Sequence, residues 1–422
     1  MTPLLSESPH TLPVHRRILL FAWLGWIFDF YDLYLLSQLL PATPLALDLG
    51  MSKGQQAWVL GSSLGFSALG GLAGGWLADR YGRKPMLMAT IVVYSAGTFA
   101  SGLAVDPWTF LLARAVTGLG VGGEWAVAHA IVGETVPPHV RGRYGAYLQS
   151  GAVVGLALAT GIGSFVAPAI GWRLAFMLSA LPALMVVAIR RQMPESDLWE
   201  RHRGERAAGV VGSHVSLAVL FGPALRKLTF LAFSVTICAM AAYWLKNIWL
   251  PTYYHEVRGF SLAESARLQW LGHLGQLAGY ACFGPLADRL GRRPSYCGFA
   301  LTKATGLLLI TLGWGMVSGS PITLGLTILM LGFGEGNWGG VGPILSELFP
   351  TQIRASALGI IYNTARGVQF LAPVLITAIA SRYTFAEGIA VGAVFAVLSG
   401  LLVWTLPETK GLKLKPAAAA AP

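Results

Sequence analysis

Two carboxyl side chains, Asp29 and Asp32, stand three residues apart in a long apolar segment near the start of the chain. On a helix this spacing places both on one face, and a rise of 1.5 Å per residue puts them about 17–21 Å into the segment. Two carboxyls this close in a medium of low dielectric constant do not both ionise readily. One of them is therefore expected to take up and release a proton, unless an arginine holds the pair for structural reasons.

A stripe of cationic and amide side chains in the second half of the chain is suited to an organic anion. Asn363, Arg366 and Gln369 follow one another at three-residue steps in another apolar segment. A guanidinium group binds a carboxylate through two parallel hydrogen bonds, so Arg366 is the predicted substrate anchor. The alternative is an arginine buried against Asp29 or Asp32 for structure alone.

Further polar side chains within apolar segments extend the candidate binding site. Gln269, His273 and Gln276 share one helical face by their spacing, and they are expected to face water or substrate unless they bond to a neighbouring helix. Lys246 and Asn337 are added as substrate contacts. Lys246 could instead extend its ammonium group to the membrane surface.

The segments that carry these residues are long and apolar. Hydrophobic residues make up 55% of the chain and charged residues only 12%, whereas soluble domains average about 25% charged residues. Such runs cross a bilayer as helices, because backbone polar groups must be satisfied within the segment. The sequence predicts an all-α integral membrane protein with twelve transmembrane helices, near residues 18–40, 55–78, 85–105, 108–134, 143–168, 171–190, 228–254, 263–287, 294–315, 321–346, 354–381 and 384–406.

Basic residues are distributed unevenly between the connections of these helices. The net charge is +11, and of the 30 Lys and Arg residues 21 fall on the side of the N-terminus, five on the opposite side and four within spans. Because cytoplasmic loops carry such an excess, both termini are expected in the cytoplasm and the chain in the cell (inner) membrane. The basic composition reflects topology, so nucleic-acid binding is not expected.

Motifs of other function classes do not occur in the sequence. The chain has no P-loop, which argues against a nucleotide partner, and no His-Glu-x-x-His pair or nucleophile motif of an integral-membrane enzyme. No cofactor and no metal site are expected. The protein is expected to function as a monomer in the lipid bilayer.

The two halves of the chain repeat each other. Segment 75–85 returns as 284–294, an offset of 209 residues, and Glu134 returns as Glu347, an offset of 213. A polar stretch separates six spans from six. The sequence therefore predicts two pseudo-symmetric six-helix bundles. Their bounds are 1–191 for the N-terminal bundle, 192–225 for a cytoplasmic linker, and 226–422 for the C-terminal bundle with a short tail.

Charged residues at the cytoplasmic ends of both repeats are predicted to form a conformational gate. Ion pairs among them would hold the inner side closed while the outer side is open, and breaking them would let the two halves rock. The alternative is solvated charge that only sets the topology. The predicted gate residues are Asp79, Arg80, Arg83, Glu134, Arg141, Asp288, Arg289, Arg292, Glu347 and Arg354.

The loop motif Gly75-x-x-x-Asp79-Arg80-x-Gly82-Arg83-Lys84 resembles the signature of the major facilitator superfamily, and the resemblance covers nearly the whole chain. Within that superfamily, segments 25–32, 114–143 and 347–366 are similar to the sialate:proton symporters and carboxylate permeases. The resemblance implies the fold of two six-helix bundles. It also links Arg114 and Glu124 to proton coupling.

Two motifs of related transporters are missing from this sequence, and their absence argues against two activities. The seventh span reads Tyr243-Trp-Leu-Lys246-Asn247 where fungal lactate permeases carry His-Ser-Gln-Asp, and the Gly-Pro-x-x-Gly-Gly element of drug exporters is missing. The resemblance implies proton-coupled uptake of a small organic anion, such as a monocarboxylate or sialate, by alternating access. The alternatives are uptake of an aromatic acid, sugar or zwitterion, and a sensor of the same fold that does not transport.

Overall fold

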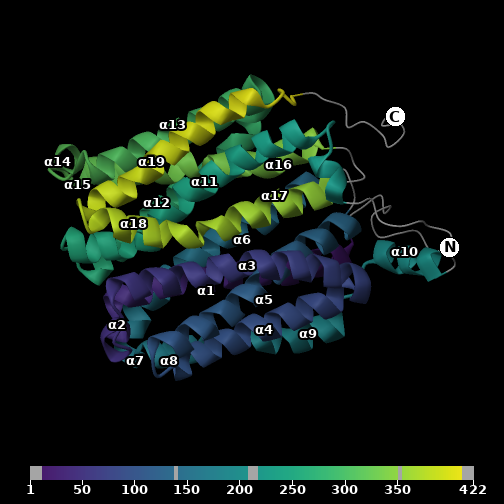
Figure 1. The fold of residues 1–422 in the computed structure, drawn as a ribbon, viewed down its shortest axis with the longest axis horizontal. Helices are drawn as coiled ribbons and strands as arrows, with labels where there is room; N and C mark the ends of the chain where they lie inside the picture. The colour runs from purple at the N-terminus through teal and green to yellow at the C-terminus, as the bar shows by residue number, and fades with distance from the viewer. Residues whose placement is uncertain (1–11, 137–140, 208–216, 350–353, 411–422) are drawn as a thin grey trace. The chain divides into compact units, whose positions relative to one another are not determined.

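The computed structural model describes residues 12–136, 141–207, 217–349 and 354–410, and their regular structure is helical (Figure 1). The long runs of the first half are α1 (Pro13–Ala42), α3 (Lys53–Tyr81), α4 (Arg83–Leu103), α5 (Pro107–Thr135), α6 with η2 and α7 (Arg141–Gly161, Ile162–Val166, Ala167–Ile170), and α8 with η3 and α9 (Trp172–Leu178, Leu181–Leu184, Met185–Gln192).

The long runs of the second half are α11 with η5 (Arg226–Thr252, Tyr253–Val257), α12 (Leu262–Leu290), α13 (Arg292–Thr311), α15 with η6 and α16 (Pro321–Phe333, Gly334–Asn337, Trp338–Leu348), α17 with η7 and α18 (Arg354–Val368, Gln369–Leu371, Ala372–Ala380), and α19 with η8 (Phe385–Leu402, Val403–Thr405). The shorter elements are α2 (Leu45–Asp48), α10 (Asp197–Ala207), η4 (Leu217–Phe221) and α14 (Trp314–Val317). The predicted spans overlap the twelve long runs formed by the described residues.

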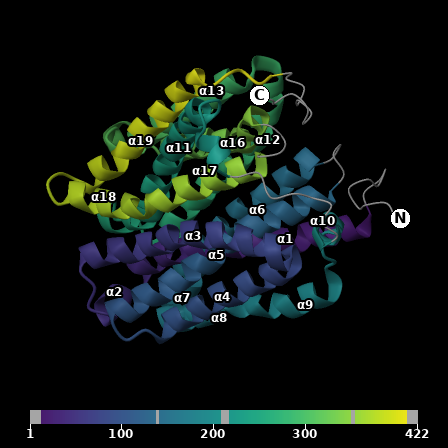
Figure 2. The same ribbon diagram turned by 45° about the vertical axis from the view of Figure 1, so that its right-hand side comes forward.

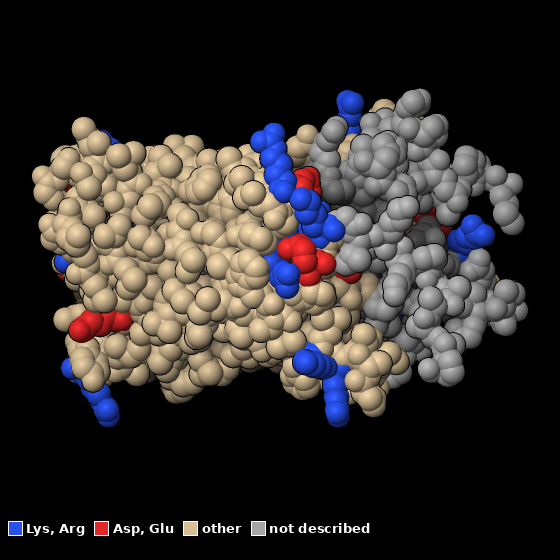
Figure 3. Space-filling view, turned by 90° about the horizontal axis from the view of Figure 1, so that it is seen from above, with Lys and Arg blue, Asp and Glu red and all other residues tan. Residues whose placement is uncertain are grey.

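The surfaces of these helices suit a lipid environment. Among the described residues, seven runs are long and apolar enough to cross a bilayer by length and composition, and α1, α4 and α19 are three of them. Large apolar side chains such as Ile322 and Leu184 point outward, which costs little in hydrocarbon. On the face seen in Figure 3, a broad band carries no charged side chain, and the Lys, Arg, Asp and Glu residues in view gather toward its two ends.

The chain divides into two compact units. Unit 1 comprises the residues up to His214, except Leu40–Ala42 and Gln56–Gly61, which group with the residues from Val215 onward as unit 2. The segment predicted as a linker, 192–225, holds α10 and η4. Of these, α10 belongs to unit 1 and contacts α5. In Figure 2 it lies at the end of unit 1 where α1 begins.

Each unit is held together by long helix-to-helix contacts. In unit 1, α4 packs along α5 and against α8 and α9, and α6 also contacts α5. In unit 2, α12 packs along α15, and α19 packs against both α11 and α13. The short η6 turn between α15 and α16 contacts α12 and α13. This packing brings polar residues of α11, α13 and η6 into the interior of unit 2.

The two predicted repeat loops adopt the same backbone turn. Gly82 separates α3 from α4 with φ +109°, and Gly291 separates α12 from α13 with φ +108°. Residues with a Cβ rarely adopt such angles. A Cβ at Gly82 would also collide with the carboxylate of Glu195, and a Cβ at Gly291 with that of Glu408. Glycine at both places therefore lets a carboxylate reach the start of the next helix.

Candidate functional site

The buried carboxyl of Asp32 on α1 pairs with Arg114 on α5. Nη2 of Arg114 donates to Oδ2 of Asp32 at 2.7 Å, and Nη1 donates to Oδ1 at 3.3 Å. The Thr98 hydroxyl on α4 donates to Oδ1 at 2.6 Å. Asp32 is 2% exposed and Arg114 is fully buried. Asp32 thus has an arginine partner, which is the structural alternative that the sequence left open.

Asp29, one helical turn before Asp32, has a different neighbour. Its side chain interacts with that of Glu124 on α5, and both residues are fully buried. Room for the Glu124 carboxyl exists because Gly25 has no side chain, since a Cβ there would collide with Oε1. The buried phenol of Tyr94 on α4 lies within electrostatic range of both carboxyls. Asp29 therefore interacts with Glu124, whereas sequence spacing alone had favoured a pair of Asp29 with Asp32.

A second buried charge cluster lies in unit 2. Oε1 of Glu335 on η6 accepts from Nζ of Lys246 on α11 at 2.6 Å, and Oε2 accepts from Nζ of Lys303 on α13 at 2.9 Å. Nζ of Lys303 also donates to Oδ1 of Asn337 at 3.2 Å. Glu335 and Lys303 are fully buried and Lys246 is 5% exposed. Lys246 therefore does not extend to the membrane surface, and Lys303, to which the sequence assigned no function, belongs to the same cluster.

Aromatic rings border this cluster. Nζ of Lys246 lies 5.8 Å from the ring centroid of Tyr243, one turn earlier on α11. The Tyr243 ring is 5.7 Å from that of Trp338 on α16, which is 6.4 Å from Tyr362 on α17. His273 on α12 lies within electrostatic range of Lys246. The cluster thus has a cationic end with aromatic rings beside it.

The predicted polar stripes on α12 and α17 are buried as well. Arg366 is 1% exposed and Asn363 is 2% exposed. On η7, Nε2 of Gln369 donates to the Ala365 carbonyl at 3.0 Å. On α12, the Gln269 amide donates to Ser265 and the Gln276 amide donates to Tyr280, at 3.0 and 2.9 Å. Both amides of α12 therefore bond within their own helix.

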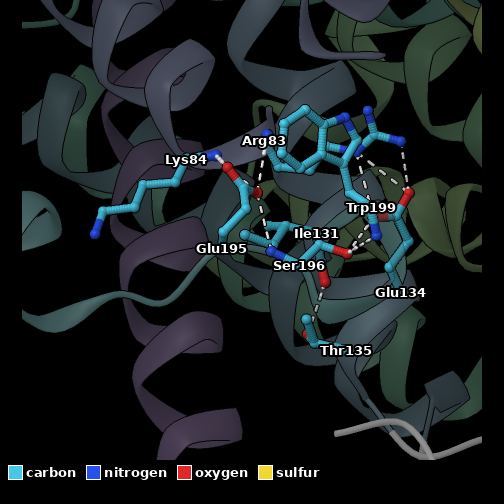
Figure 4. A network of polar contacts seen from close by, with 8 residues as sticks. All are labelled: Arg83, Lys84, Ile131, Glu134, Thr135, Glu195, Ser196 and Trp199. Carbon is cyan, nitrogen blue, oxygen red and sulfur yellow. Dashed lines mark hydrogen bonds and ion pairs between the residues drawn. The ribbon is translucent and has the colours of Figure 1, made fainter. Parts of the chain in front are cut away.

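The predicted gate of unit 1 gathers around Arg83, the first residue of α4 (Figure 4). Nη2 of Arg83 donates to Oε1 of Glu134 on α5 at 2.7 Å. Oε2 of Glu134 also accepts from the Ser196 hydroxyl at 2.6 Å. The neighbouring Glu195 accepts from the backbone N–H groups of Arg83 and Lys84. The segment between α9 and α10 therefore ties the ends of α4 and α5 together.

Unit 2 repeats this arrangement around Arg292. Its guanidinium donates to Asp288 at 2.5 Å and to Glu347 at 3.4 Å. Glu408, after α19, accepts from the backbone N–H groups of Arg292 and Arg293. Partial burial raises the pKa of the Glu408 carboxyl, but hydrogen bonds from these backbone N–H groups outweigh burial and hold the pKa below its ordinary 4.5. Glu408 is therefore ionised at neutral pH.

Glu195, Ser196 and Glu408 were not predicted as gate residues, although the sequence contains a signal for them. Pro194-Glu195-Ser196 returns as Pro407-Glu408-Thr409 at the same 213-residue offset that relates Glu134 to Glu347. Two other predicted gate residues, Arg80 and Arg289, have side chains that the structure describes. Arg80 lies over the rings of Trp76 and Tyr81, and Arg289 is exposed. The side chains of Asp79, Arg141 and Arg354 lie outside the described part of the structure.

Comparison with known proteins identifies the family. Residues 22–275 match the family model of the Major Facilitator Superfamily, and residues 271–420 match that of the sugar (and other) transporters. The sialic acid transporter NanX of Escherichia coli (strain K12) is 32% identical and covers 93% of this chain and 93% of its own length. The niacin transporter NiaP of Acinetobacter baylyi (strain ATCC 33305 / BD413 / ADP1) is 30% identical and covers 86% and 87%.

A solved structure gives the same fold. The crystal structure of a D-xylose-proton symporter covers 95% of this chain and 100% of its own, with a TM-score of 0.74 at 21% identity. Two repeated helical bundles with charged residues buried inside membrane-spanning helices define a secondary transporter. The chain belongs to the Major Facilitator Superfamily. It is a multi-pass integral membrane protein that transports small metabolites, and it is not an enzyme.

Proposed function

We propose that this transporter takes up a small organic anion together with protons by alternating access. The supporting observation is that the buried ionisable side chains are mostly acidic in unit 1 and mostly basic in unit 2. Only eight acidic or basic side chains (His aside) are at most 5% exposed among the described residues, four in each unit. In unit 1 they are the carboxyls Asp29, Asp32 and Glu124 and the cation Arg114; in unit 2 they are the cations Lys246, Lys303 and Arg366 and the carboxyl Glu335.

The surplus negative charge of unit 1 and the surplus positive charge of unit 2 would be neutralised by different mobile ions. An uncompensated charge in the protein interior costs several kcal/mol. Surplus carboxyls are neutralised by protons, so unit 1 suits proton coupling, with Asp29 and Glu124 as the pair that shares the proton and Arg114 holding Asp32. Surplus cations are neutralised by an anion, so unit 2 suits a carboxylate substrate. Arg366 is proposed as one of its anchors, since a guanidinium matches a carboxylate in geometry.

The names of two relatives support an anionic substrate. Sialic acid and niacin are both carboxylic acids, and the transporters named for them are 32% and 30% identical to this chain. Polar side chains on several helices of unit 2 are proposed to orient the rest of such a molecule. These residues are Gln269, His273, Gln276, Asn337, Asn363 and Gln369.

The repeated charge networks at the helix ends are proposed as the conformational gate. Arg83 with Glu134 and Arg292 with Glu347 each join two helices of one unit, so each pair stabilises one arrangement of its helix ends. The excess of basic residues on this side supports a cytoplasmic location for it and for both termini. Reporter fusions at the two ends of the chain would test that orientation, and an external reporter signal at either end would contradict it.

Uptake is tested with purified protein in liposomes under an imposed pH gradient. Benzoate, nicotinate, lactate, sialate, glucose and betaine serve as labelled substrates, and an acidic outside should drive accumulation of at least one of the four organic anions. A monocarboxylate with one proton moves no net charge, whereas a second proton would add about 2.3 kcal/mol per 100 mV of membrane potential. Accumulation of glucose or of the zwitterion betaine, but of none of the four organic anions, would contradict the proposal. The absence of all flux, which is the behaviour of a sensor, would contradict it as well.

A further inference from the structure

The Glu335 cluster of unit 2 contains two ammonium groups and one carboxylate. Lys246 and Lys303 bind separate oxygens of Glu335, at 2.6 and 2.9 Å. The two lysines differ in surroundings: Lys303 is fully buried and bonds to Asn337 as well, whereas Lys246 keeps 5% of its surface exposed. Lys303, which Asn337 helps to position, can therefore hold Glu335 without Lys246, and Lys246 is the member that can change partner.

A hydrogen-bond donor without an acceptor adjoins this cluster. Within the described part of the chain, Nε1 of Trp338 is buried and has no hydrogen-bond partner, and its ring lies 5.7 Å from that of Tyr243. An indole N–H only donates, and a buried donor left unsatisfied costs about 1–3 kcal/mol. Lys246 donates to the carboxylate of Glu335, and a second carboxylate would supply acceptor oxygens for both the ammonium group and the indole N–H.

The aromatic rings beside Lys246 indicate what the carboxylate is attached to. Tyr243, Trp338 and Tyr362 follow one another with centroid separations of 5.7 and 6.4 Å and edge-to-face geometry. Aromatic surfaces of this kind bind flat apolar groups through offset or edge contacts. A sugar-like body rich in hydroxyl groups would need acceptors as well as donors along the same surface.

We propose that Lys246 binds the carboxylate of a flat, unsaturated organic acid, and that Glu335 is the counter-ion which this carboxylate displaces. In the empty transporter Glu335 neutralises Lys246. When the acid binds, Lys303, which also donates to Asn337, retains Glu335, and the indole N–H of Trp338 is available to an incoming oxygen. This assignment rests on the proposed uptake of an organic anion. It adds that Lys246 binds the carboxylate of this anion and that the rest of the molecule is flat and unsaturated.

The test compares two double variants of equal charge in the full-length protein. Lys246→Met/Glu335→Gln and Lys303→Met/Glu335→Gln each remove one cation and one anion, so neither leaves a lone buried carboxylate. Binding of benzoate and nicotinate is measured by calorimetry against their uncharged amides, benzamide and nicotinamide. Lys53→Met, at an exposed position on α3, controls for loss of a lysine.

The variant that lacks Lys246 should bind the acids about ten- to hundredfold more weakly than the variant that keeps it, the loss expected for one charged hydrogen bond. Both variants should bind the amides equally. Glu335→Gln alone should bind the acids more tightly than the wild type, because the competing carboxylate is gone. Equal acid binding by the two double variants would overturn the assignment, and so would weaker acid binding by Glu335→Gln.

Failure of this inference and failure of the proposed function give different results. If wild-type vesicles accumulate lactate or sialate under an acidic outside but the protein binds neither benzoate nor nicotinate, uptake of an anion stands and the flat-acid assignment is overturned. If the wild type accumulates no carboxylate at all, the proposed function fails and the assignment fails with it.

Discussion

The carboxylate of Glu195 binds the start of α4 as the carboxylate of Glu408, 213 residues later, binds the start of α13. In each case Oε1 accepts from the first backbone N–H of the helix at 2.9 Å, and Oε2 accepts from the second at 3.1 Å. The first N–H groups of a helix have no partner within it, and the helix dipole favours a negative charge there. The same residues, Arg83 and Arg292, carry the side chains that pair with Glu134 and Glu347.

Removing either capping carboxylate should therefore affect stability and gating together. Glu195→Ala should lower the free energy of unfolding by about 0.5–2 kcal/mol, the usual loss for a helix cap, and Glu408→Ala should act in the same direction. Transport should slow in both variants, while substrate affinity stays within a few fold. Glu387→Gln, which changes a carboxyl that accepts from the backbone N–H of Thr384 at the start of α19, is the control. A large loss of substrate affinity in Glu195→Ala would contradict a role limited to the gate.

The stability supplied by Glu408 should depend on pH. Backbone hydrogen bonds hold its pKa below the ordinary 4.5 of a glutamate, so its contribution is fully present above that value and is lost as the pH falls through the lower pKa of the folded state. The melting temperatures of the wild type and of Glu408→Gln should differ at pH 7. That difference should shrink as the pH is lowered below about 4.5. A difference that is constant from pH 7 to pH 3 would mean that the carboxylate charge contributes nothing.

Asp32→Asn should lower the stability of the protein more than it impairs proton coupling. Arg114, fully buried, would lose its carboxylate partner, and breaking a buried ion pair in this way costs about 3–5 kcal/mol. The double variant Asp32→Asn/Arg114→Gln removes both charges and should recover part of that loss. The measurement is denaturant unfolding of the purified protein in detergent. An unchanged midpoint for Asp32→Asn would show that the pair does not stabilise the fold.

Proton coupling should depend on Asp29 and Glu124. Asn or Gln at these positions mimics a permanently protonated carboxyl, so Asp29→Asn and Glu124→Gln should still exchange labelled for unlabelled substrate. Neither should accumulate substrate when the outside is acidified, because no group remains to carry the proton. Both assays are run on the same vesicles, with the exposed carboxyl variant Glu264→Gln as the control. If both site variants still accumulate substrate in response to the pH gradient, the proton moves elsewhere.

Substrate affinity should depend on the guanidinium of Arg366. Arg366→Lys keeps the charge but loses the two parallel hydrogen bonds, so affinity for a carboxylate should fall, and Arg366→Ala should abolish detectable binding by calorimetry. Arg267→Ala, which changes an exposed arginine on α12, should bind as the wild type does. Normal affinity in a correctly inserted Arg366→Ala would remove this residue from the binding site.

The sequence by itself determined the class of the protein. Long apolar runs, an uneven distribution of Lys and Arg, and a repeated loop motif predicted twelve helices in two related halves, and the family comparison confirmed this. These signals depend on composition, on the distribution of charge along the chain and on motifs that recur 209 and 213 residues apart, and none of them requires knowledge of contacts between helices. Only helices and closed barrels satisfy all backbone groups in lipid, and continuous apolar runs of this length fit helices.

Only the tertiary structure decided which buried charges are partners. Asp32 and Arg114 are 82 residues apart, and Lys246 and Glu335 are 89 apart. Spacing within one helix shows that side chains share a face, but it does not show which face of another helix they meet. The sequence therefore placed Asp29 beside Asp32. Helix packing instead pairs Asp32 with Arg114 and Asp29 with Glu124. It also joins Lys303 to Glu335, a contact that nothing in the sequence around Lys303 indicated.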